Sequence, residues 1–332
     1  MPKGLFADAS PFVQLIMLAF IMLACFLFFM VIGVLLAPFI LGVSLTELLG
    51  FSNGDDPVQN LNLMRYLQVL QGIGLFIIPA FLAAYLFSRK PIHYLNLRRN
   101  PNGEALNEVK PKTRSSNWFL LTLLLMFFAM PFINLLVALN EMIVFPEILS
   151  GLEQWLRDFE EIARQTVELF LKVDTAGGLF FNIFMIAVLP ALGEELIFRG
   201  LLQKNLVRWT GSVHAGVIIS GFLFSMMHMQ FYGFFPRWLL GIMFGYMLVW
   251  SGTMWLPIFA HFVNNAVAVF LYYLIHKGVI SESIEEFGST GSDIPVTILT
   301  TIICVWIFWT MYRKRIMAPV EKQNETLVSN LM

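Results

Sequence analysis

The stretch "LPALGEELIFRG" (residues 189–200) places three ionisable side chains inside an apolar segment. Glu195 and Arg199 are four residues apart, so on a helix they share one face and can form an ion pair. Glu194 is rotated from Glu195 by about 100° on such a helix, and its carboxylate can face elsewhere. We therefore expect a mainly structural pair of Glu195 and Arg199, and chemistry at Glu194. The alternative is that all three side chains form one neutralising ion cluster.

Two more apolar stretches carry polar groups. "FLFSMMH" ends in His228, and "FAHFVNNAV" contains His261, Asn264 and Asn265. His261 and Asn265 are at i and i+4 and lie on one helix face, and Asn264 at i+3 lies close to that face. Ionisable groups inside a membrane are costly and mark functional sites. The three stretches together therefore predict one site.

A helical hairpin would bring Glu194 and His228 to one level. If the helix that contains Glu194 runs to about Trp209 and turns through "TGS" (210–212), the next helix returns antiparallel. Glu194 and His228 then both lie roughly 22–28 Å from the turn, at 1.5 Å per residue. The sequence therefore predicts that the two side chains meet.

These residue types suit the attack of water on a carbonyl group. A glutamate can act as general base, a histidine can orient the water or shuttle protons, and an asparagine amide can donate to an oxyanion. Glu194, His228 and His261 also have the donor types of a catalytic zinc site. No H-E-x-x-H helix is present, and the one G-x-S-x-G match, "GFSNG" (50–54), lies in the polar 44–63 loop and not in the apolar stretches that carry the other polar groups. Cys25 and Cys304 both lie in apolar runs, which favours a packing role.

The composition of the chain indicates that these polar groups lie in a membrane protein. Of 332 residues, 58% are hydrophobic and 13% are charged, against about 45–50% and 25% in soluble domains. We expect an all-α, polytopic membrane helix bundle with about eight spans, since each needs roughly 20 apolar residues. The expected spans are residues 11–41, 64–88, 118–140, 178–208, 213–229, 234–250, 254–276 and 294–312. The net charge of −1 and the lack of a basic tract give no sign of a nucleic-acid partner.

Loop charges predict the orientation in the membrane. Lys and Arg gather in the 89–117 loop, after the fourth span and after residue 312, whereas the 44–63 and 277–293 loops are acidic. The positive-inside rule then places both termini in the cytoplasm. Residues 141–176 alternate apolar and charged side chains at helical spacing, which predicts an amphipathic helix in the outer interface. A solvated connector helix is the alternative.

Three motifs in the order of a known family resemble the CPBP (ABI) intramembrane proteases, which include the type II CAAX prenyl endopeptidases. "EELIFR" (194–199) fits E-E-x-x-x-R, "FSMMH" (224–228) fits F-x-x-x-H, and "HFVNN" (261–265) fits H-x-x-x-[N/D]. The resemblance covers roughly residues 178–276. We therefore divide the chain into N-terminal helices (1–176), a catalytic core (177–276) and a last helix with its tail (277–332).

The resemblance implies roles for matching residues. Glu194 and His228 would hold and activate the water, and His261 and Asn265 would stabilise the oxyanion. Supporting residues at or beside the motif positions would be Glu195, Arg199, Phe224 and Asn264, with Phe224 one turn below His228. The family is described both as metal-dependent and as metal-independent. We therefore expect Glu194, His228 and His261 to be the ligands of a divalent metal such as zinc, if one is present.

The resulting hypothesis is an intramembrane endopeptidase, resident in the bilayer of a bacterial inner membrane, that acts on a membrane-associated peptide or protein. One alternative is a proton- or ion-coupled transporter in which the same residues form a relay. The inverted repeats that often mark transporters are not evident. Another alternative is a membrane scaffold or immunity protein of the same fold that binds without cutting.

Overall fold

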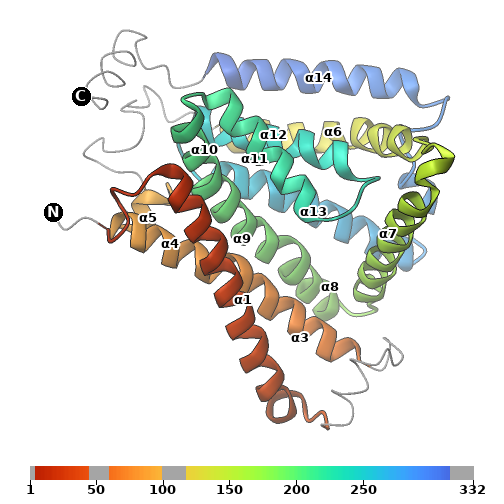
Figure 1. Cartoon of the computed structure of the whole chain (residues 1–332). Helices are drawn as coiled ribbons and strands as arrows, with labels where there is room; N and C mark the ends of the chain where they lie inside the picture. The colour runs from red at the N-terminus through yellow and green to blue at the C-terminus, as the bar shows by residue number, and fades with distance from the viewer. Residues whose placement is uncertain (1–3, 45–59, 99–116, 315–332) are drawn as a thin grey trace.

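The computed structural model describes residues 4–44, 60–98 and 117–314, and every regular element within these ranges is helical. Some of the charged residues that predict the orientation lie outside the described residues. They are Glu47, Asp55 and Asp56, those within residues 99–116, and Arg315. The N-terminal part contains α1 (Pro11–Leu41), α3 (Leu61–Gly72), α4 (Ile78–Ser88) and the short α5 (Pro91–Tyr94). α3 and α4 are joined by the π-helical segment η1 (Ile73–Ile77) into one long helix. These helices pack beside the site-bearing helix (Figure 1).

The site-bearing helix is continuous from Ala176 to Thr210. It consists of α8 (Ala176–Asn182), α9 (Leu189–Ile197) and α10 (Gln203–Thr210), joined by the π-helical segments η3 (Ile183–Val188) and η4 (Phe198–Leu202). Gly211 ends it in the left-handed conformation at φ 66°, where glycine has no steric penalty. Ser212 then caps α11 (Val213–Met227) by accepting a hydrogen bond from the amide of Ala215. The expected turn through "TGS" is confirmed.

The remaining helices enclose this hairpin. They are α6 (Trp118–Glu141), α12 (Phe234–Ser251), α13 (Trp255–His276) and α14 (Ile294–Arg313). Short 3₁₀ turns, η2 (Glu147–Leu149) and η5 (Glu282–Ile284), lie in the connecting loops. α13 contacts α6, α9 and α12, so it lies at the centre of this half of the bundle.

Six of the described helices are long and apolar enough to cross a membrane: residues 11–41, 61–88, 118–141, 176–210, 255–276 and 294–313. The chain is therefore a multi-pass membrane protein. The other two expected spans are also helical, but α11 has 15 residues and covers about 22 Å of a hydrocarbon core about 30 Å thick. α12 has 18 residues and carries Arg237 in its first turn. The eight expected spans therefore correspond to eight helical segments. Two of these, α11 and α12, do not reach the length and apolarity of the other six.

Contacts place several helix ends at one end of the bundle. The amide of Phe6, before α1, donates to Leu86 at the end of α4. Asn96, beyond α5, joins Lys204 of α10 to Gly252 after α12. The end of α14 reaches the same region, since the rings of Tyr312 and Trp250 lie 5.6 Å apart. The start of α1 and the end of α14 therefore lie at one end of the molecule, as Figure 1 also shows.

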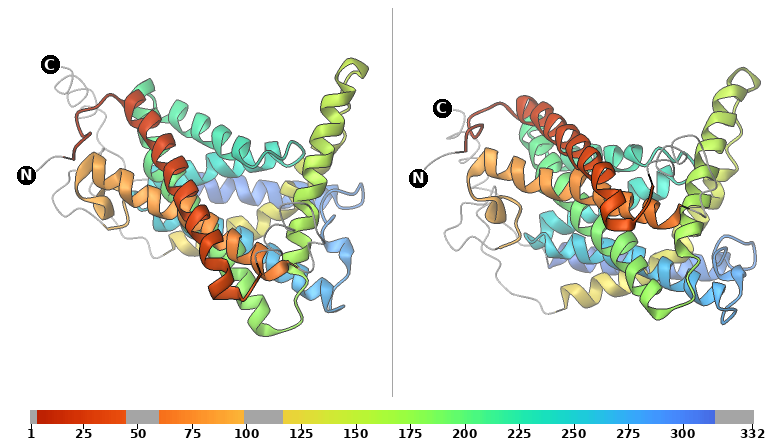
Figure 2. Two further views of the ribbon diagram at one scale, coloured as in Figure 1. Left: turned by 60° about the horizontal axis from the view of Figure 1, so that its bottom comes forward. Right: turned by 90° about the horizontal axis from the view of Figure 1, so that it is seen from below.

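The expected amphipathic helix is α7 (Ser150–Leu171). It crosses the directions of α6 and α14 steeply, at the end of the bundle opposite to the start of α1 (Figure 1). Both views of Figure 2 show it standing out beyond the other helices. Its apolar side exposes Leu152, Trp155, Phe159 and Ile162. A position in the membrane interface stays a prediction, as does the division of the chain at residues 176 and 276.

Candidate active site

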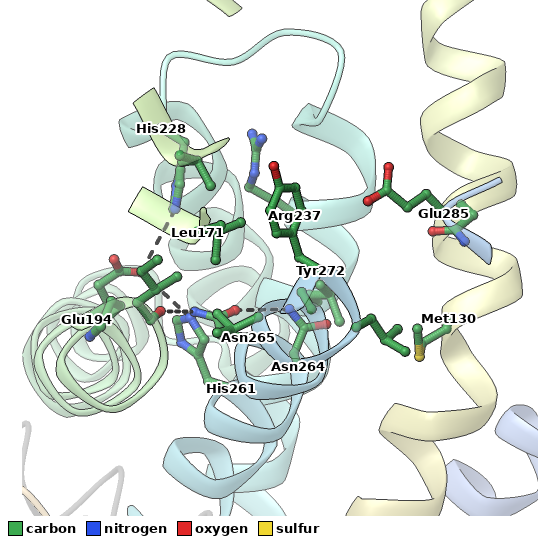
Figure 3. A pocket seen from close by; sticks show the side chains of 18 of the residues that line it. Met130, Leu171, Glu194, His228, Arg237, His261, Asn264, Asn265, Tyr272 and Glu285 are labelled. Carbon is green, nitrogen blue, oxygen red and sulfur yellow. Dashed lines mark hydrogen bonds and ion pairs between the residues drawn. The ribbon is translucent and has the colours of Figure 1, made fainter. Parts of the chain in front are cut away.

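The hairpin brings the first two predicted site residues together. Glu194 lies in α9, and His228 follows the last residue of α11. The His228 Nε2 atom is 4.0 Å from Glu194 Oε2 (Figure 3). The expectation that the two residues lie at one level is therefore confirmed. The helices on the two sides of the "TGS" turn explain it, because Glu194 and His228 lie about equally many residues from the turn, although η4 interrupts the α-helical pattern on one side.

His261 of α13 reaches the same carboxylate from another side. Its Nε2 atom is also 4.0 Å from Glu194 Oε2. Its ring is stacked on Phe244 at 5.4 Å and meets Phe224 edge-on at 5.8 Å. Glu194 Oε2 is buried and has no hydrogen-bond partner among the described residues. A buried acceptor left open in this way is the place for a water molecule or a cation.

The partner of each histidine indicates its protonated nitrogen. His228 Nδ1 is 2.9 Å from the carbonyl oxygen of Phe224, so it must donate there. His261 Nδ1 is 3.0 Å from Glu195 Oε1 and donates to that carboxylate. These partners assign both Nδ1–H tautomers and turn both Nε2 atoms toward Glu194. Three acceptor atoms then converge, and a water molecule or a cation between them would satisfy them.

Glu195 and Arg199 form the expected pair. Arg199 Nη1 lies 3.1 Å from Glu195 Oε1, and both side chains are fully buried. Arg199 Nη2 also donates to the carbonyl of Gly241 at 2.9 Å, and the guanidinium lies over the ring of Phe224 at 4.6 Å. The pair therefore links α9 to α11 and α12. Phe224 packs against the ring of His228 at 5.1 Å, in the position expected for it.

Asn265 and Asn264 line the same cavity from α13. Asn265 Nδ2 donates to the carbonyl of Ile186 at 3.1 Å, and Asn264 Nδ2 donates to Asn265 Oδ1 at 3.1 Å. Ile186 lies in η3, where the widened π-helical turn alters the normal hydrogen-bond pattern. An amide nitrogen has two N–H groups, so Asn265 keeps one for another acceptor.

The cavity around these residues has a volume of 560 Å³. The predicted residues form part of its polar wall, and much of the rest is apolar, with Met130, Leu171, Leu240, Phe244 and Val269 among the lining side chains. It extends from Glu194 to Leu171 of α7 and to Glu285 (Figure 3). Such a mixture of apolar walls and a few convergent polar groups is typical of a substrate site.

Sequence reasoning missed Arg237, which also lines this cavity. The signal was present, because "FFPRWLL" holds a single arginine within an expected span. Sequence reasoning likewise gave no contact between Glu195 and His261. Such a contact depends on how α9 and α13 are rotated relative to each other, and spacing within one helix does not determine that rotation.

The donor types suit a divalent metal, but within the described residues no three His, Cys, Asp or Glu side chains lie close enough together to hold one as they stand. Zinc-binding histidines usually donate their second ring N–H to a carbonyl or a carboxylate, as His228 and His261 do here. Two ligands of one tetrahedral zinc would lie about 3.3 Å apart, given Zn–N distances of about 2.0–2.1 Å. The 4.0 Å separations from Glu194 would therefore have to shorten. As they stand, they suit a bridging water with hydrogen bonds of about 2.7–2.8 Å. Metal binding stays a prediction.

Comparisons with known proteins find relatives of the segment that carries this site. Residues 176–267 match the family model described as type II CAAX prenyl endopeptidase Rce1-like. The Bacillus subtilis protein YpbD is 32% identical over 93 residues, which cover 26% of this chain and 43% of YpbD. The sporulation-killing factor biosynthesis protein SkfC of the same organism is 30% identical over 125 residues, which cover 35% of this chain and 23% of SkfC.

The aligned segments thus span less than half the length of either relative. No solved structure matches the chain. The matched residues contain all three motifs and every residue that converges on Glu194. Residues 176–267 are thus similar to the Rce1-like type II CAAX prenyl endopeptidases.

Proposed function

We propose that this protein is an intramembrane endopeptidase that hydrolyses a membrane-associated peptide or protein with a water molecule activated by Glu194. One observation carries the proposal: Glu194 Oε2 lies 4.0 Å from the Nε2 atoms of both His228 and His261. The buried, unpartnered carboxylate oxygen can accept a proton from a water held between it and an imidazole. The family match to residues 176–267 supports the same reaction class.

The proposed reaction has two steps. The water oxygen bonds to the scissile carbonyl carbon while its proton passes to Glu194, and the carbonyl oxygen becomes an oxyanion. The C–N bond then breaks as Glu194 returns the proton to the leaving nitrogen. The immediate products are a carboxylic acid and an amine, and the acid then gives up its remaining proton to water.

His261 and Asn265 are proposed to stabilise the oxyanion. His261 lies between the carboxylates of Glu194 and Glu195, which hold its ring at the edge of the cavity. A doubly protonated His261 would donate from Nε2, while the free N–H of Asn265 offers a second donor. His228 would accept a hydrogen bond from the attacking water.

If a divalent cation such as zinc is used, Glu194, His228 and His261 would hold it. It would supply Lewis-acid polarisation and a lowered pKa of bound water. The fixed Nδ1 partners of both histidines support this possibility. The roles of Glu195 in orienting His261 and of Asn265 in the cavity do not depend on the cation.

We further propose a bacterial inner-membrane location with both termini in the cytoplasm. Lys90, Lys204, Arg208 and Arg313 belong to the group of helix ends and loops that gathers at the start of α1. Excess Lys and Arg favour the cytoplasmic side. Cysteine labelling of single-cysteine variants at residue 5, where Leu5 is exposed, and at residue 314 in intact cells would test this.

The decisive experiment uses the full chain in lipid nanodiscs with a library of membrane-spanning peptides. Wild type, Glu194→Gln and the matched surface control Glu147→Gln are compared, each with and without a strong chelator. We expect cleavage by wild type and Glu147→Gln and none by Glu194→Gln. Loss of cleavage on chelation and its recovery with zinc would show that a metal takes part. Cleavage that the chelator does not change would favour water activation by Glu194 alone. Full cleavage by Glu194→Gln would overturn the proposed mechanism.

A further inference from the structure

Arg237 places a positive charge on the wall of the cavity without an acidic partner. It lies in the first turn of α12 and lines the same cavity as Glu194 (Figure 3). Its Nη1 atom donates to the backbone carbonyl of Gln230 at 3.2 Å, and its Nη2 atom donates to the side-chain oxygen of Gln230. Within the described parts of the chain, no carboxylate forms an ion pair with it. Both of its hydrogen-bond partners are therefore neutral.

Nearby carboxylates are engaged elsewhere. Glu160 and Glu194 are the acidic groups close enough to act on Arg237 through space. Glu160 Oε2, however, accepts a hydrogen bond from the amide of Tyr232 at 2.9 Å, and Glu194 faces the two imidazoles. Partial burial of a charge without a counter-charge is costly. If Arg237 served only to hold Gln230 in place, it would need hydrogen-bond donors but no charge.

The loop before α12 is built closely around the guanidinium. A Cβ atom added to Gly233 would lie 2.2 Å from Arg237 Nη2 and 2.6 Å from its Cζ. A glycine there lets the backbone approach the guanidinium, which Gln230 also holds. The planar group is thus oriented before any ligand arrives, and a fixed guanidinium suits two-point binding of a carboxylate.

We propose that Arg237 forms a carboxylate-binding subsite of the cavity, so that the preferred substrate presents a carboxylate near the bond that is cut. This proposal rests on the proposed peptidase function for treating the cavity as a substrate pocket. The carboxylate is either the free C-terminus of the substrate or an acidic side chain. Leu240 and Phe244, which line the cavity on the same helix, would contact apolar parts of the substrate beside it.

The test measures binding rather than cleavage. The Glu194→Gln protein, full length in nanodiscs of zwitterionic lipid, is titrated with four N-dodecanoyl dipeptides. Leu-Leu with a free carboxylate is compared with Leu-Leu amide, and Glu-Leu amide is compared with Gln-Leu amide. We expect one or both carboxylate probes to bind about tenfold more tightly than their neutral partners, a ratio typical of one charge-assisted contact. The pair that shows the preference identifies the source of the carboxylate.

Three further variants separate charge from packing. Arg237→Gln should remove the preference, Arg237→Lys should weaken it because an ammonium group lacks the planar fork, and Gln230→Ala should retain it. Equal binding of both members of both pairs, or a preference that survives Arg237→Gln, would overturn the proposal. If Arg237→Gln does not fold, Arg237→Lys and Gln230→Ala are compared with each other. An equal preference of these two variants for the carboxylate probe would contradict the subsite. Because no probe has to be cleaved, failure of the proposed hydrolysis is recorded separately.

Discussion

Glu195 Oε1 lies 3.0 Å from His261 Nδ1, and this contact joins the buried ion pair to the reacting groups. The same oxygen lies 3.1 Å from Arg199. Glu195 therefore does more than neutralise an arginine, because it also fixes the tautomer and the direction of an imidazole that faces Glu194. Two adjacent glutamates thus have different tasks: Glu194 faces the cavity, and Glu195 holds one of the groups that face it.

Glu195→Gln should lower stability and activity together. The amide keeps the shape of the side chain but leaves Arg199 buried without a counter-charge, and breaking such a pair costs about 3–5 kcal/mol. His261 also loses its carboxylate partner. Glu194→Gln should remove activity with little change in stability, because Glu194 has no ion pair closer than 4.0 Å. The melting temperature and folded yield of both variants in the same detergent check this contrast, and an unchanged melting temperature for Glu195→Gln would count against the structural role.

Replacing both members of the pair should separate the two roles of Glu195. Arg199→Ala alone should reduce the folded yield, since Glu195 is then left buried and unpaired. Glu195→Leu combined with Arg199→Met removes both charges at similar volume and should recover much of the stability. It should not recover hydrolysis, because His261 still lacks its partner. Recovery of activity in the double variant would show that Glu195 acts on stability alone.

Sequence reasoning succeeded where one helix or one tight turn determines the geometry. Spacing of four residues predicted the pairing of Glu195 with Arg199, and equal helix lengths around "TGS" predicted that Glu194 meets His228. Runs of apolar residues predicted the helices, and charge alternation predicted α7. These features depend on local periodicity, which a sequence displays directly.

The features that sequence reasoning missed depend on the relation between helices. The contact of Glu195 with His261 requires a particular rotation of α13 against α9, and the bond of Asn265 to Ile186 requires the π-helical turn in η3. Arg237 was overlooked because one arginine in an expected span can equally lie at a helix end. The sequence also predicted about eight spans, and six of the described helices have the length and apolarity to cross a membrane, while α11 is a shorter apolar helix that packs against α12.

Asn265→Ala should reduce the rate of hydrolysis far more than Asn264→Ala. Asn265 is bonded to the backbone of η3 and held by its neighbour, which points its remaining N–H group for the proposed oxyanion. Loss of one oxyanion donor typically lowers kcat by about 10²–10³-fold. Asn264 acts through Asn265, so its loss should cost less than about tenfold. Steady-state kinetics on one cleaved peptide would test this, and the reverse order would transfer the role to Asn264.

Gly241→Ala should weaken the contact between α11 and α12. A Cβ atom at Gly241 would lie 2.9 Å from the Cα of Gly221 and 3.3 Å from Arg199 Nη2. Backbone atoms cannot move aside, and overpacking of this kind costs about 1–3 kcal/mol. We expect a lower melting temperature and reduced activity. Gly151→Ala in α7 is the matched control, because nothing lies within 4 Å of its added Cβ atom, and it should be neutral or slightly stabilising. Equal melting temperatures for the two variants would contradict the packing argument.

Glu285→Gln should stabilise the protein at neutral pH. Burial raises the pKa of the Glu285 carboxyl, and the charges of Glu282, Glu168 and Glu286 raise it further. A raised pKa means that the folded protein favours the protonated acid. The free energy of unfolding of wild type therefore rises as the pH falls through the raised pKa of Glu285. This gain is complete below the ordinary pKa of 4.5. The variant should melt at a higher temperature at pH 7, and its advantage should shrink as the pH approaches 4.5. Glu147→Gln, at an exposed position remote from this cluster, controls for the general effect of removing one negative charge. A Glu285→Gln difference that does not change with pH would mean that the carboxyl is not strained by its surroundings.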